Sequence, residues 1–388
     1  MSIENKQSLA FVVSDINFFF SHRIDLAKKL SDNFEIFVFT DCSEKNKSEL
    51  LKFNFIKFIH LKTRLNKNRL LNILSMIRYG IDLIALLKSN KIKNVLYITL
   101  ESSMIGAVAS RFLEIKNFFV ISGIYVLSEK KVIKSIAIAI FSLFKSTKNK
   151  FIFQNDEDQL FFEEMLGKGH YSCVIKGNGI NLSSINFNPI NNVGTVKFLF
   201  ASNLFYSKGV ADFYNAALNL INSNYNADFF IAGAYKKNHP VSIKDSLYKN
   251  IERSEVINYL GAWDQKTFLK NLYDYHVFVL PSFGEGMPLA AMEAMASGRA
   301  LICSDVPGCN SCIIDNKNGY LCEPRSSKSL AQSMQKIIQN KKQISEMGEC
   351  SRKMVEKELY NFYNKNIFKL SEDKVPIRKW LGSLLASA

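Results

Sequence analysis

Two carboxylates stand eight positions apart in the stretch VLPSFGEGMPLAAMEAMASG, which begins at Val279. Glu285 follows a glycine ahead of Pro288, and Glu293 lies in an apolar run after it. Carboxylates accept hydrogen bonds from hydroxyl groups, so a sugar or a ribose is the kind of ligand that such a pair could hold. The structural alternative is that Glu285 is a solvated loop acid and Glu293 an exposed helix residue. The spacing alone is weak evidence, and the elements around the two acids give it meaning.

Those elements are predicted to be a strand, a turn and a helix. The run HVFVLPS (276–282) has the length and apolar character of a buried strand. A helix is expected from about Pro288, because proline is favoured in the first helical position, and Gly298 is placed to end it. Gly284 and Gly286 let the backbone approach a ligand. Free N–H groups and the helix dipole make the start of this helix suitable for phosphate.

In this arrangement Glu285 precedes the helix and Glu293 lies about a turn and a half inside it. At 1.5 Å per residue the two acids are up to ~12 Å apart. That separation is too wide for an acid–base pair. It is roughly the reach of a nucleotide sugar, with the diphosphate at the helix start between the acids.

Apolar runs of strand length alternate with helical patterns along most of the chain, which predicts an α/β fold with parallel strands buried on both faces. The polar, turn-rich segment 186–195 predicts the boundary between two doubly wound domains, 1–190 and 191–365, followed by a helical segment at 366–388. Ligands of open parallel sheets bind beyond the carboxyl ends of the strands, so the site is expected in a cleft between the two domains. The predicted strands are LAFVVS (9–14), FEIFVFT (34–40), NVLYITL (94–100), NFFVIS (117–122), KFIFQN (150–155), VKFLFAS (196–202), ADFFIAG (227–233), HVFVLPS (276–282) and ALICSD (300–305).

The first half of the chain is strongly basic. The whole chain has 50 Lys and Arg against 35 Asp and Glu, a net charge of +15, and residues 1–150 carry 24 of those cations and 12 of those acids. This imbalance indicates an anionic partner such as lipid headgroups, phosphate or nucleic acid. The N-terminus is polar and predicts no signal peptide. The apolar run Val132–Phe144 is 13 residues long, short of the ~20 that span a bilayer, and predicts a buried or interfacial helix.

Seven cysteines, an odd number spread over the chain, favour a reducing compartment over a disulfide framework. Cys309-x-x-Cys312, with Cys303 and Cys322 nearby, has part of a zinc-site spacing. A second CxxC pair is missing, and Cys303 lies in a predicted strand, so a zinc site is not expected.

The segment Val279–Glu323 resembles the signature of glycosyltransferase family 4, which comprises retaining enzymes of the GT-B fold. The resemblance covers most of residues 9–370. It implies two Rossmann-like domains facing across a cleft, with a C-terminal helix that crosses back to the first domain. Further matching segments occur in the same order along the chain: FFFSHRIDLAKKL (18–30), FIFQNDEDQLFF (151–162), VIKGNGINLSSINFNP (174–189) and FLFASNLFYSKGVADFYNAA (198–217).

The resemblance also implies roles for individual residues. Glu285 would hold hydroxyls of a donor sugar, Glu293 the nucleotide ribose, and Lys208 the departing diphosphate; the alternative for Lys208 is a solvated loop lysine. No metal or other cofactor is implied, so Lys208 and the helix N-terminus would stabilise the leaving charge. The acceptor's proton would pass to the donor phosphate. The other implied donor-binding residues are Ser282, Gly286, Met287, Leu289, Asn203, and Gly261 with Ala262 facing the base.

The first domain is expected to bind the acceptor. Phe18–Phe20 precede Ser21, His22 and Arg23 at the mouth of the first helix, and a basic cluster follows at Lys62–Arg69. A polyprenyl diphosphate needs cations for its phosphates and apolar contacts for its lipid. The alternative is that the phenylalanines are core, the lysines a solvated face, and His22 and Arg23 merely a helix start. Gly123 matches a cleft loop of the family.

Two features depart from the family pattern. The position of a usual second phosphate-binding arginine holds Asn203, and the first strand is followed by SDINFFFS, which lacks the usual glycine-rich turn. The first departure is expected to weaken the stabilisation of the leaving group. Because of the second, the family's loop on the acceptor side is not carried over to this chain.

The function expected from these observations is a metal-independent retaining glycosyltransferase. It would move an N-acetylhexosamine or hexose from a UDP-sugar to a polyprenyl-diphosphate-linked saccharide for a surface polysaccharide such as O-antigen or capsule. The protein would be cytoplasmic, associated with the inner face of the plasma membrane through its basic first domain, with no nucleic-acid partner. The alternatives are a nucleotide-sugar 2-epimerase of the same fold and a non-catalytic protein that binds anionic glycans.

Overall fold

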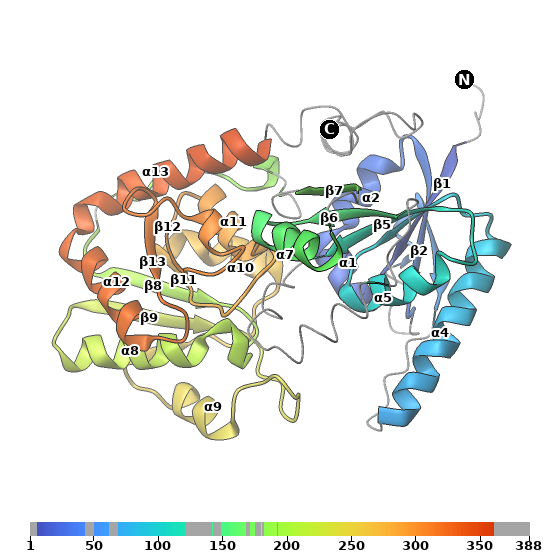
Figure 1. The fold of residues 1–388 in the computed structure, drawn as a ribbon. Helices are drawn as coiled ribbons and strands as arrows, with labels where there is room; N and C mark the ends of the chain where they lie inside the picture. The colour runs from blue at the N-terminus through green and yellow to red at the C-terminus, as the bar shows by residue number, and fades with distance from the viewer. Residues whose placement is uncertain are drawn as a thin grey trace. The chain divides into compact units, whose positions relative to one another are not determined.

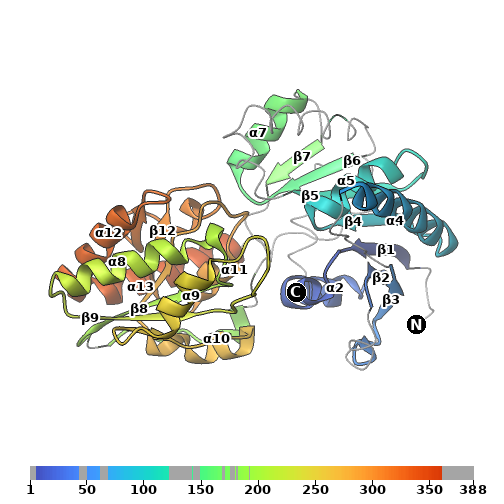
Figure 2. The same cartoon turned by 90° about the horizontal axis from the view of Figure 1, so that it is seen from below.

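The computed structural model describes residues 6–42, 50–61, 69–121, 142, 149–167, 171–174, 180, 182–191 and 193–360. These residues form two compact units that divide at Asn178 and Gly179 (Figures 1 and 2). The sequence places the boundary later, at 190. In the structure Ile180, Ile185 and Ile190 are buried in the hydrophobic clusters of the second unit, so this segment belongs to that unit.

The first unit is built on a seven-stranded parallel sheet with the strand order β3-β2-β1-β4-β5-β6-β7. Its strands are β1 (Gln7–Val12), β2 (Phe34–Thr40), β3 (Ile56–His60), β4 (Asn94–Tyr97), β5 (Lys116–Ile121), β6 (Asn149–Phe153) and β7 (Tyr171–Val174). Its helices are α1 (Ile16–His22), α2 (Ile24–Leu30), α4 (Arg69–Ser89), α5 (Leu100–Ala109) and α7 (Asp156–Leu166).

The two faces of this sheet bury different side chains, because successive residues of a strand point to opposite sides. Ala10 and Val12 of β1 join the cluster that α4, α5 and α7 cover. Phe11, between them, points the other way and meets Phe19 of α1 edge to face, with ring centroids 5.6 Å apart. Burial on both faces explains why the strands are almost continuously apolar.

The second unit has a six-stranded parallel sheet with the order β10-β9-β8-β11-β12-β13. Its strands are β8 (Val196–Ala201), β9 (Ala227–Ala232), β10 (Ile257–Tyr259), β11 (Val277–Leu280), β12 (Ala300–Ser304) and β13 (Gly319–Cys322). Its α-helices are α8 (Val210–Asn222), α9 (Asp245–Glu252), α10 (Gln265–Asn271), α11 (Leu289–Ala296), α12 (Ser327–Gln339) and α13 (Ile344–Met354). Shorter helical turns are η3 (Leu182–Ser184), η4 (Tyr206–Lys208), η5 (Leu272–Asp274), η6 (Asn310–Cys312), η7 (Lys341–Gln343) and η8 (Val355–Tyr360).

This sheet also separates two hydrophobic clusters. Val277 and Val279 of β11 belong to one cluster, and Phe278 and Leu280 to the other. The prediction of two doubly wound α/β domains with parallel sheets is therefore confirmed. A consequence is that β8 and β11 are neighbours, so the loops after both strands open at the same edge of the sheet.

Some expectations fall outside the described residues, namely those for the run Val132–Phe144, apart from Ser142, and for the segment 366–388. Among the helices that the structure describes, none combines the length and apolar character that crossing a membrane requires.

Candidate active site

The turn between β11 and α11 carries the residues that the sequence singled out. α11 begins at Leu289, one residue after the predicted first helical residue, Pro288, which is instead the N-cap. The backbone N–H of Met292 donates to the Pro288 carbonyl at 3.2 Å. As predicted, Gly298 ends the helix: it has a φ of +85° just after the C-cap Ser297.

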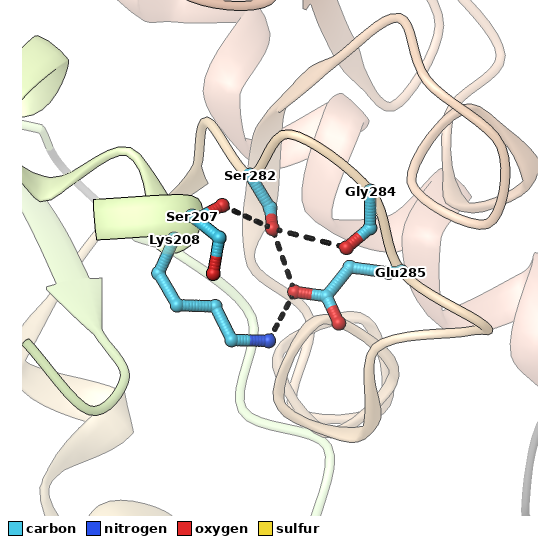
Figure 3. Close-up of polar contacts among 5 residues, drawn as sticks. All are labelled: Ser207, Lys208, Ser282, Gly284 and Glu285. Atoms are coloured by element: carbon cyan, nitrogen blue, oxygen red, sulfur yellow. Dashed lines mark hydrogen bonds and ion pairs between the residues drawn. The ribbon is translucent and has the colours of Figure 1, made fainter. Parts of the chain in front are cut away.

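At this turn Glu285 and Lys208 form an ion pair. Lys208 Nζ lies 2.5 Å from Glu285 Oε1, although the residues are 77 positions apart in the sequence (Figure 3). Lys208 ends η4, in the loop after β8, and Glu285 lies in the loop after β11. The side chains are 27% and 14% exposed, so both are partly withdrawn from water but still reachable by a ligand.

Ser282 holds the Glu285 carboxylate from the other side. Its hydroxyl lies 2.8 Å from Glu285 Oε1 and 3.1 Å from the Ser207 carbonyl oxygen (Figure 3). The backbone N–H of Phe283 also donates to the Ser207 carbonyl, at 2.8 Å. Because Ser282 is fully buried, these bonds join the loop after β8 to the loop after β11 in a defined geometry. Ser282, expected to bind the donor, here orients the carboxylate.

Two glycines allow the loops to approach this closely. Gly209, directly after Lys208, has a φ of +73°, and a Cβ there would lie 1.9 Å from the Pro281 carbonyl oxygen. Gly308 has a φ of +81°, and a Cβ there would lie 2.4 Å from the Glu285 carbonyl oxygen. No side chain fits at either position, so backbone contacts on two sides fix the Lys208 and Glu285 loops.

Glu293 lies inside α11 and is only 4% exposed, which excludes the exposed-residue alternative. Its Oε1 accepts a hydrogen bond of 2.6 Å from Nε2 of Gln265, at the start of α10. Burial raises the pKa of Glu293 to about 7, while the Gln265 bond acts in the opposite direction. A buried carboxyl group with one partner keeps acceptor capacity for a ligand hydroxyl.

Sequence reasoning did not identify Gln265. Its only signal was its place, three residues after Ala262, in the predicted base-facing segment. Gly261 follows β10 with a φ of +73°, and its carbonyl accepts the Gly233 N–H at 2.7 Å. Ala262 is exposed on the same loop. The loop thus carries both the residues expected at the base and the amide that contacts Glu293.

The remaining expected donor-binding residues lie after β8 or between β11 and the first residue of α11, and they differ in exposure. Gly286 and Leu289 are half-buried, and Met287 is buried in the cluster beneath α11. Asn203 is exposed in the loop between β8 and η4, and its carbonyl accepts the Phe205 N–H at 2.7 Å.

Another cation lies over the same turn and was not predicted. The Arg325 guanidinium lies 5.0 Å from the ring centroid of Phe283, and that ring meets Tyr206 edge to face at 5.3 Å. Phe283 is the neighbour of Ser282, and Tyr206 begins η4. Arg325 follows β13, which ends at the same sheet edge as β11, so only the strand order brings it near this turn.

The acceptor-binding residues expected in the first unit are described only in part. Ser21 and His22 end α1. Arg23 is buried at the junction between α1 and α2, where its backbone N–H donates to the Phe19 carbonyl. Phe19 is fully buried, so for this residue the core alternative is right. Gly123 and residues 62–68 of the basic cluster lie outside the described residues.

Within the described ranges, no three His, Cys, Asp or Glu side chains gather closely enough to hold a metal ion. Cys303, Cys309, Cys312 and Cys322 are all buried thiols. Burial raises the pKa of the Cys303 and Cys309 thiols well above the usual range, which favours neutral core residues. The expectation that no metal is needed stays a prediction.

Comparison with known proteins points to one class of fold. Residues 184–354, most of the second unit, match the family described as Glycosyl transferases group 1. Sucrose-phosphate synthase from Thermosynechococcus elongatus superposes with a TM-score of 0.74 at 16% identity, over 91% of this chain and 95% of that one. A point mutant of Staphylococcus aureus TarM superposes with a TM-score of 0.70 at 14% identity, over 97% of this chain and 99% of that one. These likenesses show the fold, which is that of the GT-B glycosyltransferases.

Two relatives have names that mention lipid-linked sugars. One is the Campylobacter jejuni N,N'-diacetylbacillosaminyl-diphospho-undecaprenol alpha-1,3-N-acetylgalactosaminyltransferase, 28% identical over 62% of this chain and 66% of the relative. The other is the Escherichia coli UDP-Gal:alpha-D-GlcNAc-diphosphoundecaprenol alpha-1,3-galactosyltransferase, 27% identical over 54% of this chain and 56% of the relative. The chain thus aligns with just under two thirds of the length of the Campylobacter jejuni relative and with just over half of the length of the Escherichia coli relative.

Proposed function

We propose that the protein is a retaining glycosyltransferase of family 4 that moves an N-acetylhexosamine or hexose from a UDP-sugar to a polyprenyl-diphosphate-linked saccharide. The observation that carries this proposal is the ion pair between Lys208 and Glu285, held by Ser282 at the carboxyl edge of the second sheet. It places one cation and one hydroxyl acceptor side by side, beside the N-terminus of α11.

This pair suits a ligand with a diphosphate next to a sugar. When such a ligand enters, its phosphate oxygens compete with Glu285 for the Lys208 ammonium group. Glu285 then becomes free to accept hydrogen bonds from sugar hydroxyls, while Lys208 takes up the phosphate charge. That charge grows as the bond from the sugar to the phosphate breaks, so a cation fixed beforehand lowers the barrier more than it strengthens ground-state binding.

Glu293 and Gln265 are proposed to hold the ribose, and Gly261 and Ala262 the base. Both glutamates would then act as hydroxyl acceptors at the two ends of the nucleotide sugar, with the diphosphate between them at the start of α11. In this mechanism the donor phosphate takes the acceptor's proton, so neither glutamate acts as a general base. No metal ion is needed in the proposal.

The proposed acceptor and location rest on the relatives and on charge. The Campylobacter jejuni and Escherichia coli relatives have undecaprenyl-diphosphate-linked sugars in their names, and residues 1–150 are strongly basic. A cytoplasmic protein bound peripherally to the inner face of the plasma membrane would meet such an acceptor and could add sugars to a surface polysaccharide. Ser21, His22, Arg23 and Gly123 remain proposed acceptor-binding residues.

The test is transfer from a panel of labelled UDP- and GDP-sugars to lipids extracted from bacterial membranes. We expect label in the lipid fraction for one UDP-sugar, and its loss in Glu285→Gln and Lys208→Met. The matched controls are Glu349→Gln and Lys353→Met, which alter an exposed ion pair of 3.7 Å on α13 of the same unit and should leave transfer unchanged.

Three outcomes would contradict the proposal. Conversion of the donor to its 2-epimer without an acceptor would identify an epimerase. Binding of anionic glycans with no turnover of any donor would indicate a non-catalytic protein. Full transfer by the Glu285→Gln variant would show that the Glu285 carboxylate is not needed for transfer, which contradicts the proposed site.

A further inference from the structure

An apolar groove runs between α4 and α5 on the outer side of these helices. The two helices pack against each other and lie side by side in Figures 1 and 2. The groove has a volume of about 380 Å³, and its lining is almost entirely apolar. Its floor includes Gly80, Ile84, Ile105 and Ala109, and four exposed apolar residues line it as well: Ile77, Ile81, Val108 and Phe112.

These four side chains are not the face with which the helices cover the sheet. On α4 the buried stripe is Tyr79, Leu83 and Leu87, whereas Ile77 and Ile81 are 56% and 61% exposed. Val108 and Phe112 are 44% and 64% exposed. Each pair has the i, i+4 spacing that places two side chains on one helix face or its continuation.

Such a concentration of exposed apolar side chains is unusual for a solvated surface. Eleven large apolar side chains are counted as exposed in the part of the chain that the structure describes, and four of them meet at this groove. Contiguous exposed apolar surface commonly marks a site of contact with a protein or a membrane. The groove stays open where Gly80 and Ala109 line it, because neither residue has a side chain long enough to fill it. A Cβ added at Gly80 would already lie in van der Waals contact with Ile105, at 3.5 Å.

The charges beside the groove indicate which occupant fits. Lys88, Lys91 and Lys93 line a neighbouring hollow of about 470 Å³, and Phe112 is a wall of both cavities. Glu114 is the acidic residue of that hollow. Over residues 76–115 the sequence has five cations against three acids. An apolar groove with lysines at one end is complementary to a surface that offers acyl chains below anionic headgroups.

We propose that the groove between α4 and α5 docks the protein on an anionic lipid bilayer. Ile77, Ile81, Val108 and Phe112 enter the acyl region, and Lys88, Lys91 and Lys93 contact the headgroups. This inference rests on the proposed function and deepens it, because it names the surface that brings the enzyme to its lipid-linked acceptor. A second copy of the chain is a poorer occupant, since groove-to-groove pairing would add a second row of lysines to one interface.

The surface differs from the one that the sequence suggested. Phe18–Phe20 were expected beside the acceptor lipid, but Phe19 is fully buried and Phe20 packs against Phe53 and Phe58. The described exposed apolar surface of the first unit is instead concentrated on α4 and α5.

The test is flotation of the full-length protein with vesicles of phosphatidylcholine alone or mixed with phosphatidylglycerol. We expect binding to the anionic vesicles that weakens as salt increases. The double variant Ile81→Ser with Phe112→Ser should reduce the bound fraction about ten-fold or more, because it removes apolar side chains that insert. The matched control is Leu160→Ser, an apolar residue on α7 that is 59% exposed.

Two further variants test the parts of the proposal separately. Lys88→Gln with Lys91→Gln and Lys93→Gln should reduce binding to anionic vesicles while leaving the thermal melting temperature unchanged. Phe112→Trp should show a blue-shifted emission on adding anionic vesicles, whereas Leu160→Trp should not, because only the first tryptophan enters the acyl region.

Equal flotation of the wild type and the Ile81→Ser, Phe112→Ser variant would overturn the proposal. A dimer without lipid that the same variant abolishes would assign the groove to a second copy instead. UDP binding, measured by calorimetry on the same proteins, keeps the two proposals apart. Normal UDP binding without flotation rejects the docking surface alone, whereas absence of UDP binding rejects the proposed donor.

Discussion

At the scale of residues, the candidate site is a set of polar groups whose partners are specific. Lys208 and Glu285 neutralise each other, Ser282 orients the Glu285 carboxylate, and Glu293 is buried with Gln265 as its hydrogen-bond donor. Partly buried charges are costly without partners, so the ion pair keeps both side chains in place until a ligand replaces one of them.

The first prediction concerns Lys208. Lys208→Ala should lower kcat about 10²-fold or more while changing the Kd for the UDP-sugar much less, because the leaving diphosphate carries more charge in the transition state. Steady-state kinetics and calorimetry measure the two quantities. Lys353→Ala serves as the control. Small and equal losses in kcat and Kd would contradict a role in stabilising the leaving group.

The second prediction concerns the pH dependence that Glu293 gives to stability. Its pKa is about 7 in the folded protein against an ordinary value of 4.5, so the folded state retains a proton that the unfolded chain releases between these values. Stability should therefore be fullest below pH 4.5 and fall as pH rises through 7, by at most about 3 kcal/mol.

The variant Glu293→Gln should abolish that fall, since the amide keeps an acceptor for Gln265 and does not ionise. Urea unfolding at several pH values from 5 to 8 measures the difference from wild type, which should grow with pH. Glu349→Gln, at an exposed position on α13, should show no such trend. A constant difference across this range would contradict the raised pKa.

At the scale of elements, the site depends on how closely two loops approach. The loop after β8 brings Lys208, the loop after β11 brings Glu285, and they meet because these strands are neighbours in the sheet. The left-handed conformation of Gly209 lets the first loop pass against Pro281. Helix α11 adds an N-terminus beside this junction, so two loops and one helix end converge at one sheet edge.

The third prediction tests this approach. Gly209→Ala should lower the free energy of unfolding by about 1–3 kcal/mol, because the residue has a φ of +73° and its new Cβ would collide with the Pro281 carbonyl. Urea denaturation measures the loss, and transfer activity should fall with it as the Lys208 loop shifts. Gly194→Ala is the control, since a Cβ there meets nothing within 4 Å. Equal stability of the two variants would contradict the close approach.

At the scale of the whole molecule, the chain contains two units with separate hydrophobic interiors. Both large clusters around the second sheet consist of residues from 180 onward, and the described cluster of the first unit ends at Leu166. Each sheet is thus covered by its own helices, which is the property of a domain that folds by itself. The functional groups divide in the same way, with the proposed donor site in the second unit and the docking groove in the first.

The fourth prediction follows from this division. A fragment of residues 179–362 should fold cooperatively and bind UDP with an affinity close to that of the whole chain, while showing no affinity for anionic vesicles. Circular dichroism, calorimetry and flotation measure these properties. Insolubility of the fragment would contradict independent folding of the second unit. Loss of UDP binding in a folded fragment would show that residues of the first unit complete the donor site.

The resemblance to glycosyltransferase family 4, rather than spacing or periodicity, identified Lys208 as a candidate residue. The sequence by itself determined the doubly wound class, nine of the thirteen strands that the structure describes, and Glu285 and Glu293 as candidate residues. These features are local: apolar runs of strand length, helix periodicity, a proline before a helix and a glycine after it depend on neighbours along the chain. The burial of Phe19 and of Glu293 was not decided locally, because burial depends on what covers an element. The pattern of charged and apolar residues was also compatible with two interpretations of Phe18–Phe20, as contacts for the acceptor lipid or as core residues.

Only the tertiary structure decided which residues are partners. Lys208 meets Glu285, and Gln265 meets Glu293, because the strand order β10-β9-β8-β11-β12-β13 brings loops from distant parts of the chain to one sheet edge. The groove between α4 and α5 likewise exists only where two helices pack with small residues at their contact. Periodicity specifies which face of an element is apolar, whereas the packing of elements decides which apolar face stays open to a partner.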